Sequence, residues 1–317
     1  MIGGVFTAIS SHFTNYEISH QLRNSESVVV FVDGSYLKKV LAVLPECPKI
    51  RKIVVLGNFP KTNSPVEIVP FKHLNKFSTE RPTNVPEINP EDIFWLPYSS
   101  GTTGLPKGVM ITHKNWLDHF KSYINHANNV FKKNMDLPDS PYLIAFMPIY
   151  HAMGYSGSLT ALIRGQTIVL MKKYKLENLL QLIEKYRPNF LAAAPVIAQQ
   201  MAKNPIAQNY DVSSIKWIGT GGAKLDEGCM KTLYEKFPNI EVIGQGYGMT
   251  ECVTVLTMTR AKRSDPMDSS GYPFYGVEIK IVDPETEIHV PIGKLGEIRF
   301  KAPYTMKGYW KNPEATR

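Results

Sequence analysis

Short apolar runs recur along the chain, and stretches with helical periodicity separate them. This rhythm is typical of α/β proteins with a largely parallel sheet, because unbroken apolar strands suit a sheet that is covered on both faces. The sequence therefore predicts an α/β fold built from layered subdomains. The predicted strands span residues 28–32, 52–56, 142–147, 167–170, 190–193, 215–219 and 241–244.

Other segments predict helices, a connection and a second kind of module. Apolar residues spaced as on one side of a helix run from 116 to 130, with Thr112 as its candidate cap, and another set lies at 176–183. Residues 58–90 are rich in Pro, Asn, Ser and Lys, which predicts a surface connection. After Gly271 the pattern alternates with period two, which predicts a small antiparallel, partly barrel-like β module. The predicted divisions are 1–135 and 136–260 for two α/β subdomains and 261–317 for the β module.

Composition excludes several classes of protein. With 317 residues, 43% hydrophobic and 20% charged, the chain is expected to bury a core and is neither a disordered chain nor a coiled coil. The formal charge of +8 comes without zinc-finger spacing or an aromatic-rich RNA-binding motif, so we expect no nucleic-acid partner. Three widely spaced cysteines argue against a disulfide framework and for a reducing compartment.

Two apolar stretches do not predict export or membrane insertion. The first twenty residues carry no Lys or Arg, so they lack the charged region of a signal peptide. Residues 140–163 are uncharged, but Pro and Gly residues interrupt them, so we expect no transmembrane segment there. An intracellular location is therefore expected.

The strongest chemical signal lies in residues 96–110, Leu-Pro-Tyr-Ser-Ser-Gly-Thr-Thr-Gly-Leu-Pro-Lys-Gly-Val-Met. Glycines let backbone N–H groups approach an anion, hydroxyls donate further hydrogen bonds, and a lysine supplies a point charge. The loop is not a Walker A motif, because Lys107 is followed by Gly108 and Val109 rather than by a Ser or Thr that opens a helix. The predicted phosphate-binding residues are Ser99, Ser100, Gly101, Thr102, Thr103, Gly104 and Lys107.

Together with further motifs in the same order, this loop resembles the signature of the adenylate-forming superfamily. That superfamily contains acyl-CoA synthetases, 4-coumarate:CoA ligases, beetle luciferases and the adenylation domains of peptide synthetases. The further motifs are Met-Pro-Ile-Tyr-His at 147–151, Gly-Thr-Gly-Gly-Ala at 219–223, Gly-Tyr-Gly-Met-Thr-Glu at 246–251, Gly-Lys-Leu-Gly-Glu-Ile at 293–298 and Lys-Gly-Tyr-Trp at 307–310. The likeness covers nearly the whole chain.

The resemblance implies a role for each matched residue. Lys107, His151, Thr250 and Glu251 would be catalytic, and Glu251 would coordinate Mg²⁺. The adenine and AMP would contact Gly221, Gly222, Ala223, Gly246, Tyr247, Gly248, Met249 and Thr250, and the acyl group would contact His151, Tyr155 and Gly219. From its residue type alone, His151 fits either a hydrogen-bonded structural role or the positioning of the substrate. His113, which follows Thr112, is expected to be a local turn residue.

The implied activity is the ATP-dependent activation of a carboxylic acid, a small-molecule partner, to an acyl-adenylate, followed by thioester formation with CoA. Two alternatives stay open: a catalytically weak nucleotide-binding pseudoenzyme fragment, and a luciferase-type monooxygenase that shares the adenylation step. Compared with the family pattern, a portion before residue 1 and the mobile C-terminal domain with its lysine are expected to lie outside this chain, which puts independent activity in question. Protein partners and the acyl substrate are not predicted; cytoplasmic or peroxisomal fatty-acid or phenylpropanoid metabolism is the expected setting.

Overall fold

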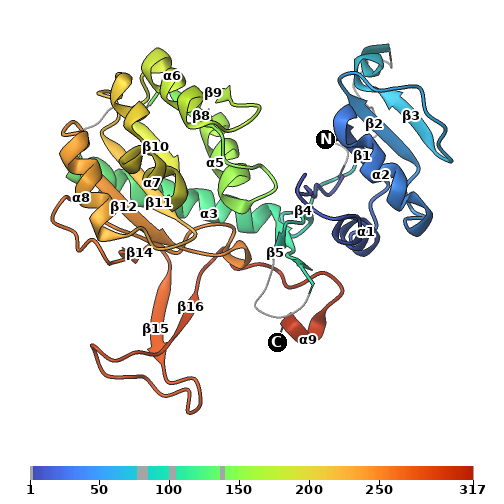
Figure 1. Cartoon of the computed structure of the whole chain (residues 1–317). Coiled ribbons are helices and arrows are strands. Elements are labelled where there is room, and N and C mark those ends of the chain that lie inside the picture. The colour runs from blue at the N-terminus through green and yellow to red at the C-terminus, as the bar shows by residue number, and fades with distance from the viewer. Residues whose placement is uncertain (1–2, 77–84, 100–104, 136–139, 317) are drawn as a thin grey trace. The chain divides into compact units, whose positions relative to one another are not determined.

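The computed structural model describes residues 3–76, 85–99, 105–135 and 140–316. These residues form two compact units (Figure 1). One unit combines residues 1–113 with residues 307–317, and the other spans residues 114–306. The division of the chain at residues 135 and 260 stays a prediction.

The first unit contains a three-stranded parallel sheet in the order β1–β2–β3. Helices α1 and α2 bury their apolar sides together with the central strand, in a core that includes Ile18, Leu37 and Ile53. A capping box between Thr14 and Glu17 fixes the start of α1. The elements are α1 (Asn15–Asn24), β1 (Val29–Asp33), η1 (Gly34–Tyr36), α2 (Leu37–Val43), η2 (Leu44–Glu46), β2 (Lys52–Leu56), β3 (Glu67–Pro70) and η3 (Phe71–Lys76).

Strand β3 corrects the expectation that residues 58–90 form only a surface connection. It pairs in parallel with β2, and its Val69 is buried. An ion pair of 3.0 Å between Lys52 and Glu67 joins the first residues of the two strands. The sequence does not predict this strand, because β3 contains only two apolar residues other than proline, Ile68 and Val69, and they are flanked by a glutamate and a proline.

Two short antiparallel ladders complete the first unit. Strand β4 pairs with β7, and β5 pairs with β6. His113 begins the next helix and stacks on Phe94 with ring centroids 4.9 Å apart, so it is not a turn residue. The elements are β4 (Ile93–Trp95), β5 (Tyr98–Ser99), β6 (Lys107–Gly108), β7 (Ile111–Thr112) and α9 (Pro313–Thr316).

The second unit is built on a five-stranded sheet in the order β10–β11–β12–β13–β14. The first three strands are parallel and are linked by helices, as the alternating pattern predicts. Their apolar side chains pack with α6, α7 and α8 in a core whose fully buried members include Leu179, Met201 and Ile218. The elements are α6 (Leu176–Tyr186), β10 (Phe190–Ala193), α7 (Pro195–Lys203), η5 (Pro205–Asn209), β11 (Trp217–Gly221), α8 (Glu227–Lys236), β12 (Val242–Tyr247), η6 (Thr250–Cys252), β13 (Thr257–Met258) and β14 (Tyr272–Pro273).

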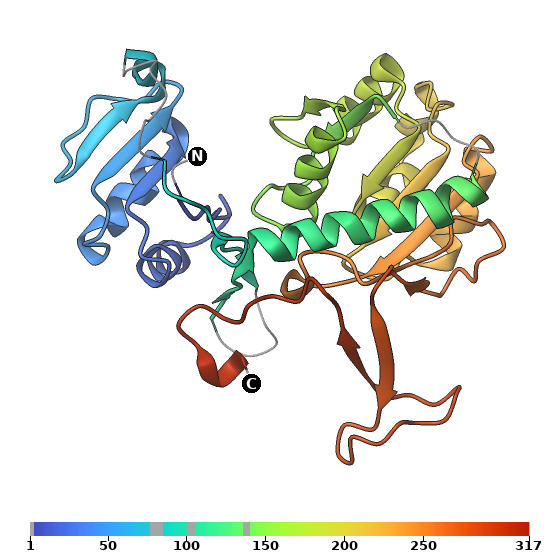
Figure 2. The same cartoon turned by 180° about the vertical axis from the view of Figure 1, so that it is seen from behind.

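The long helix α3 lies along the face of this sheet opposite α7 and α8 (Figure 2). It spans His113–His126 and continues through a π-helical segment, Ala127–Phe131, into α4, Lys132–Asn134. The ring of Phe131 packs against Trp217, with centroids 4.5 Å apart, so the helix is fixed to the start of β11. A separate parallel pair lies beside these layers: β8 (Tyr142–Ala145) and β9 (Thr167–Leu170), connected by α5 (Ala152–Ile163).

After the sheet, β15 (Glu278–Val282) and β16 (Glu297–Lys301) pair in antiparallel fashion. This hairpin extends away from the five-stranded sheet of its own unit (Figures 1 and 2). The antiparallel pairing predicted for this region is confirmed, whereas its closure into a barrel stays a prediction.

The strands predicted in the α/β part are confirmed. Those at 52–56, 167–170 and 190–193 coincide with β2, β9 and β10, and the others differ from β1, β8, β11 and β12 by one to three residues at an end. All three cysteines are buried and unpaired. In the part of the chain that the structure describes, no helix is both long enough and apolar enough to cross a bilayer.

Candidate functional site

The second unit contains a cavity of about 410 Å³ that is partly open to solvent. Its wall comes from the carboxyl ends of β11 and β12, from one side of α5 and from the face of α3 that covers the sheet. Ligands of parallel α/β sheets bind at the carboxyl ends of the strands, where loops and helix starts converge. The cavity is therefore the candidate binding site of this unit.

Two glycine-rich motifs meet in the cavity because their strands are neighbours in the sheet. Strands β11 and β12 are parallel, and Gly221 pairs with Gly246 at their carboxyl ends. Gly222 has a φ of +84°, which an L side chain rarely adopts. The predicted residues that line the cavity here are Gly219, Gly221, Gly222, Gly246, Tyr247, Gly248, Met249 and Thr250.

The aromatic ring predicted to contact adenine is Tyr247, the last residue of β12. Its side chain is half-buried in the cavity wall, and burial raises the pKa of its hydroxyl. Tyr247 therefore stays neutral at physiological pH and offers an uncharged ring face to a ligand.

The loop after β12 contains a strained turn. Val253 has φ 65° and ψ −55°, and the N–H of Thr254 donates to the carbonyl of Cys252 at 2.7 Å. This is a γ-turn of the rare, strained hand. Val253 is fully buried, and the turn brings Thr254 and Val255 into the cavity wall beside Gly248.

His151 is the N-cap of α5. Its Nδ1 accepts a hydrogen bond from the N–H of Met153 at 3.3 Å, and the residue also lines the cavity. Burial lowers the pKa of His151, so the neutral ring prevails near pH 7. Since Nδ1 accepts, the neutral ring carries its proton on Nε2. The structure thus shows the structural role of His151 as a helix cap, while its role in positioning a substrate stays a prediction.

Some predicted residues lie outside the cavity wall. Among the described residues, those that line the cavity do not include Tyr155, Ala223 or Glu251. Tyr155 lies on another side of α5, since the helix turns Ala152, Met153, Ser156, Gly157, Thr160, Ala161 and Arg164 toward the cavity. The acyl-binding role of Tyr155 therefore stays a prediction.

Glu251 lies in the short helix η6, directly after the cavity residue Thr250. Its side chain is half-buried, and its backbone carbonyl accepts a hydrogen bond from the N–H of Met306 at 2.8 Å. This contact holds η6 in place within the unit, and a carboxylate oxygen there has the chemistry that Mg²⁺ prefers.

The predicted phosphate-binding loop belongs to the first unit. Ser99 in β5 pairs with Lys107 in β6, so the two strands form the stem of the loop. The ammonium group of Lys107 lies over the ring of Tyr309, 4.5 Å from its centroid, which is a cation–π contact. The predicted loop residues Ser100, Gly101, Thr102, Thr103 and Gly104 lie outside the described residues.

The same unit brings together two motifs that are distant in the sequence. The N–H of Trp310 donates to the carbonyl of Gly108 at 2.7 Å, and the N–H of Met110 donates to the carbonyl of Gly308 at 2.9 Å. The indole N–H of Trp310 also reaches the carbonyl of Asn24 at 2.8 Å. The motif at 307–310 therefore supports the stem that carries Lys107.

The cavity wall contains a group of polar residues that the sequence did not predict. Within the described part of the chain, buried side-chain atoms of five cavity residues have no hydrogen-bond partner in the protein. The predicted buried side of helix α3 consisted of apolar residues between 116 and 130, but the buried residues of α3 also include His119 and His126. The seven-residue spacing of these two histidines, two helical turns, could have indicated them. The five residues are His119, Ser156, Trp217, Thr220 and Thr254.

Comparison with known proteins gives a consistent result. The family model described as AMP-binding enzyme matches residues 1–310. The chain is 36% identical over 318 residues to acyl-CoA synthetase 7 of Caenorhabditis elegans, covering 99% of this chain and 57% of that protein. It is 33% identical over 322 residues to 4-coumarate–CoA ligase 1 of Petroselinum crispum, covering 99% of this chain and 56% of that protein.

A solved structure shows the same fold. The anthranilate CoA ligase AuaEII in complex with anthranoyl-AMP superposes with a TM-score of 0.84 at 23% identity, covering 99% of this chain and 58% of that one. The chain thus spans somewhat more than half the length of the relatives it matches. The predicted resemblance to the adenylate-forming proteins is confirmed.

Proposed function

Because the chain belongs to the AMP-binding enzyme family, we propose that it binds ATP and a carboxylic acid, joins them as an acyl-adenylate and passes the acyl group to CoA. The observation that carries this proposal is the cavity at the carboxyl ends of β11 and β12, where both glycine-rich motifs and His151 meet. The relatives named acyl-CoA synthetase and 4-coumarate–CoA ligase support the same reaction class.

The proposed reaction has two steps. A carboxylate oxygen attacks the α-phosphorus of ATP, a new P–O bond forms, and the bond to the β-phosphate breaks to release pyrophosphate. The sulfur of CoA then attacks the acyl carbon, AMP leaves with the electrons of the C–O bond, and the thiol proton is lost. The first step needs no protein base to activate the acid, because a carboxylic acid is ionised at neutral pH.

The residues of the cavity suit the first step. Tyr247 and Gly222 would hold the adenine ring, and the Nε2–H of His151 would donate to the carboxylate and orient it toward phosphorus. A neutral donor orients the carboxylate without holding it as tightly as a full positive charge would. Lys107, on the stem of the predicted phosphate loop, would offset negative charge on the β- and γ-phosphates.

We propose Glu251 as a protein ligand for Mg²⁺. A single carboxylate fits this ion, which commonly completes its shell with substrate phosphates and water. The ion would supply positive charge that stabilises the negative charge developing on the departing pyrophosphate. Mg²⁺ dependence, placement in the cytoplasm or the peroxisome, and a role in fatty-acid or phenylpropanoid metabolism stay predictions.

Two measurements on the purified chain test the proposal. Calorimetry with ATP and Mg²⁺ reports nucleotide binding, and ATP–pyrophosphate exchange across a panel of aliphatic and aromatic acids reports adenylation. Glu251→Gln should weaken ATP binding in Mg²⁺ but leave binding in EDTA unchanged, and Glu227→Gln on α8 is the matched control. Binding without exchange would favour the nucleotide-binding fragment over the ligase, and absence of both would contradict the proposal.

A further inference from the structure

One sequence motif has no role in the proposed function, the segment Lys-Gly-Tyr-Trp at 307–310. The ring of its Tyr309 lies against the ammonium group of Lys107, with 4.5 Å between Nζ and the ring centroid. Both residues belong to the first unit, and both are half-buried. This contact joins the motif to the lysine that the proposed function assigns to the β- and γ-phosphates of ATP.

Backbone pairing brings the two side chains together. Residues 308–310 run antiparallel to residues 108–110, since the N–H of Trp310 donates to the carbonyl of Gly108 at 2.7 Å and Tyr309 forms a β-bridge with Val109. Residues two apart on a strand point to the same side, so Lys107 and Val109 share a face. Tyr309 lies opposite Val109 and therefore diagonal to Lys107, within reach of a long side chain.

Side-chain hydrogen bonds hold the motif and the loop stem on one framework. The indole N–H of Trp310 donates to the carbonyl of Asn24 at 2.8 Å, and the side-chain oxygen of Asn24 accepts from the hydroxyl of Tyr98 at 2.6 Å. Tyr98 lies in β5, which pairs with the strand that carries Lys107. The ring and the lysine are thus fixed by the same group of contacts before any ligand binds.

Two other lysines near the ring reach different groups. The ammonium group of Lys307 donates to the carbonyl of Glu91 at 3.2 Å, and that of Lys311 pairs with Glu26 at 2.7 Å. Lys107 has no carboxylate partner among the described residues. The lysine on the stem of the predicted phosphate loop is therefore the one that the ring of Tyr309 holds.

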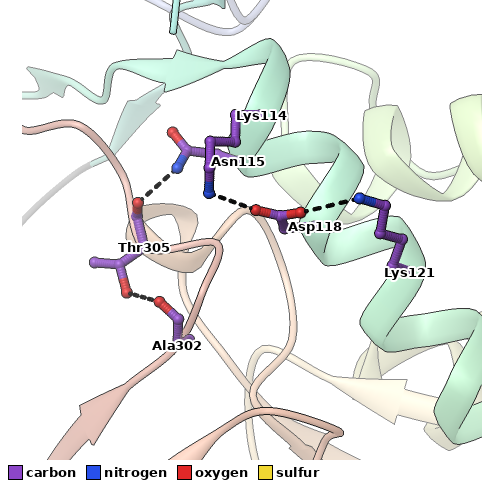
Figure 3. Close-up of polar contacts among 6 residues, drawn as sticks. All are labelled: Lys114, Asn115, Asp118, Lys121, Ala302 and Thr305. Atoms are coloured by element: carbon purple, nitrogen blue, oxygen red, sulfur yellow. Dashed lines mark hydrogen bonds and ion pairs between the residues drawn. The ribbon is translucent and has the colours of Figure 1, made fainter. Parts of the chain in front are cut away.

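A neutral ring holds a lysine differently from a carboxylate. On α3, Lys114 and Lys121 both pair with Asp118, at 2.7 and 3.5 Å (Figure 3), and its negative charge offsets theirs. The face of an aromatic ring attracts an ammonium group through its quadrupole but carries no net charge. Tyr309 therefore restricts Lys107 while leaving its positive charge available to a phosphate.

This restriction favours ATP binding. A mobile lysine loses side-chain freedom when it contacts a ligand, which weakens binding by roughly threefold to tenfold. The contact with Tyr309 removes part of that freedom in the protein without a ligand. An ammonium group has three N–H donors, so a lysine with one side on the ring can still donate to phosphate oxygens.

Resting on the proposed function, we infer that Tyr309 is a positioning residue of the ATP site, whose ring holds the ammonium group of Lys107 ready for the β- and γ-phosphates. The ring acts through the lysine and does not itself touch the nucleotide. The motif at 307–310 thereby gains a role in ATP binding. Since AMP lacks these two phosphates, the effect of Tyr309 is confined to ATP.

Calorimetric titration of the full chain with ATP and, separately, with AMP tests the inference. Tyr309→Leu removes the ring and should weaken ATP binding about threefold or more, while AMP binds as before. Tyr309→Phe keeps a ring face and should bind ATP within about twofold of the unaltered chain. The matched control is Tyr186→Leu at the end of α6, where the ammonium of Lys185 lies 5.3 Å from the ring centroid, and it should change neither affinity.

A double-mutant cycle shows whether the ring acts through the lysine. Lys107→Met keeps an unbranched side chain but removes the charge, so adding Tyr309→Leu should weaken ATP binding no further. Lys121→Met instead removes a lysine that pairs with Asp118 (Figure 3). In that background, Tyr309→Leu should weaken ATP binding as much as it does in the unaltered chain.

Several outcomes would overturn the inference. One is an ATP affinity of Tyr309→Leu equal to that of the unaltered chain, and another is a full loss that persists in the Lys107→Met background. An equal loss for AMP would show that Tyr309 supports the fold and not the lysine. All three leave the proposed function to ATP binding and pyrophosphate exchange by the unaltered chain. If the unaltered chain binds no ATP, the proposed function fails, and the inference fails with it.

Discussion

Gly248 lies so close to the backbone of Thr254 that a β-carbon on Gly248 would stand 1.9 Å from the Thr254 carbonyl oxygen. No side chain can move to relieve such a contact, because the obstructing atom is backbone. The glycine at this position of the motif is therefore required by packing within the cavity wall, independently of any ligand.

Replacing Gly248 by Ala should push the segment around Thr254 away from the strand end. We expect the free energy of unfolding to fall by about 2 kcal/mol or more, as for other overpacked sites. Gly157→Ala in α5 is the matched control, because a β-carbon there meets no atom within 4 Å, and helix propensity predicts a gain of about 0.5–1 kcal/mol. Urea denaturation of both variants measures the difference, and equal stabilities would contradict the packing argument.

The turn at Val253 predicts an unusual order of stabilities. Its φ of 65° is strained for any L residue and free of strain for glycine. Val253→Gly should therefore be about 1 kcal/mol more stable than Val253→Ala, although glycine also loses the buried β-carbon that alanine keeps. In the middle of α7, Ala198→Gly should instead cost about 1 kcal/mol. Thermal or urea unfolding of the three variants checks whether glycine is favoured over alanine at residue 253 and disfavoured at residue 198. A Val253→Ala variant more stable than Val253→Gly would contradict the prediction.

His151 allows its two roles to be separated. Asparagine can cap α5 through its side-chain oxygen, so His151→Asn should keep the stability, whereas His151→Ala should lose about 1 kcal/mol. Neither replacement places an Nε2–H donor at the acid, so both should slow ATP–pyrophosphate exchange by a similar factor. If His151→Asn kept both the stability and the exchange rate while His151→Ala lost both, His151 would have only its capping role.

Lys107→Ala removes a positive charge from the stem of the predicted phosphate loop. A charge-assisted hydrogen bond stabilises a complex by roughly 1.5–3 kcal/mol, so we expect ATP to bind about tenfold or more weakly. Lys121→Ala on α3 removes a lysine that pairs with Asp118 at the surface, and ATP affinity should be unchanged. Calorimetric titration with ATP measures both, and equal affinities would remove Lys107 from the site.

The two buried histidines of α3 predict a dependence of stability on pH. Burial lowers the pKa of His119 and of His126 to about 4, from an ordinary 6.5. The unfolded chain therefore takes up protons before the folded chain does, and the free energy of unfolding should fall as the pH drops from 6.5 to 4. For each ring the loss corresponds to roughly 3 kcal/mol.

His126→Phe should flatten this dependence. The ring of His126 stacks on Phe274 with centroids 4.1 Å apart, and phenylalanine keeps that contact without a proton to gain. Urea denaturation at several pH values between 7 and 4 measures the slope for both proteins. The difference between the two slopes gives the contribution of His126, because carboxylates that titrate in this range are the same in both proteins. Identical slopes would show that His126 is not buried as a neutral ring.

Local pattern was enough to predict much of the fold. Runs such as 53–56 and 190–193 are apolar throughout, which favours strands covered on both faces, and they lie in β2 and β10. Strand β3 was not predicted, because two apolar residues are too few to show a strand pattern. Its strand conformation depends on pairing with β2. The buried side of helix α3 was predicted only in part, because the segments that pack against a helix determine which of its sides is buried.

By itself, the sequence determined the order of the motifs and the chemistry they bring: glycines at strand ends, a lysine in a hydroxyl-rich loop, and a glutamate after Tyr-Gly-Met-Thr. Only the tertiary structure decided which residues meet. The parallel pairing of β11 with β12 joined Gly221 to Gly246, and α3 turned His119 into the cavity while Tyr155 lay on another side of α5. The physical reason is that residue type and spacing are local, whereas burial and unpaired hydrogen-bonding groups depend on contacts between segments far apart in the chain.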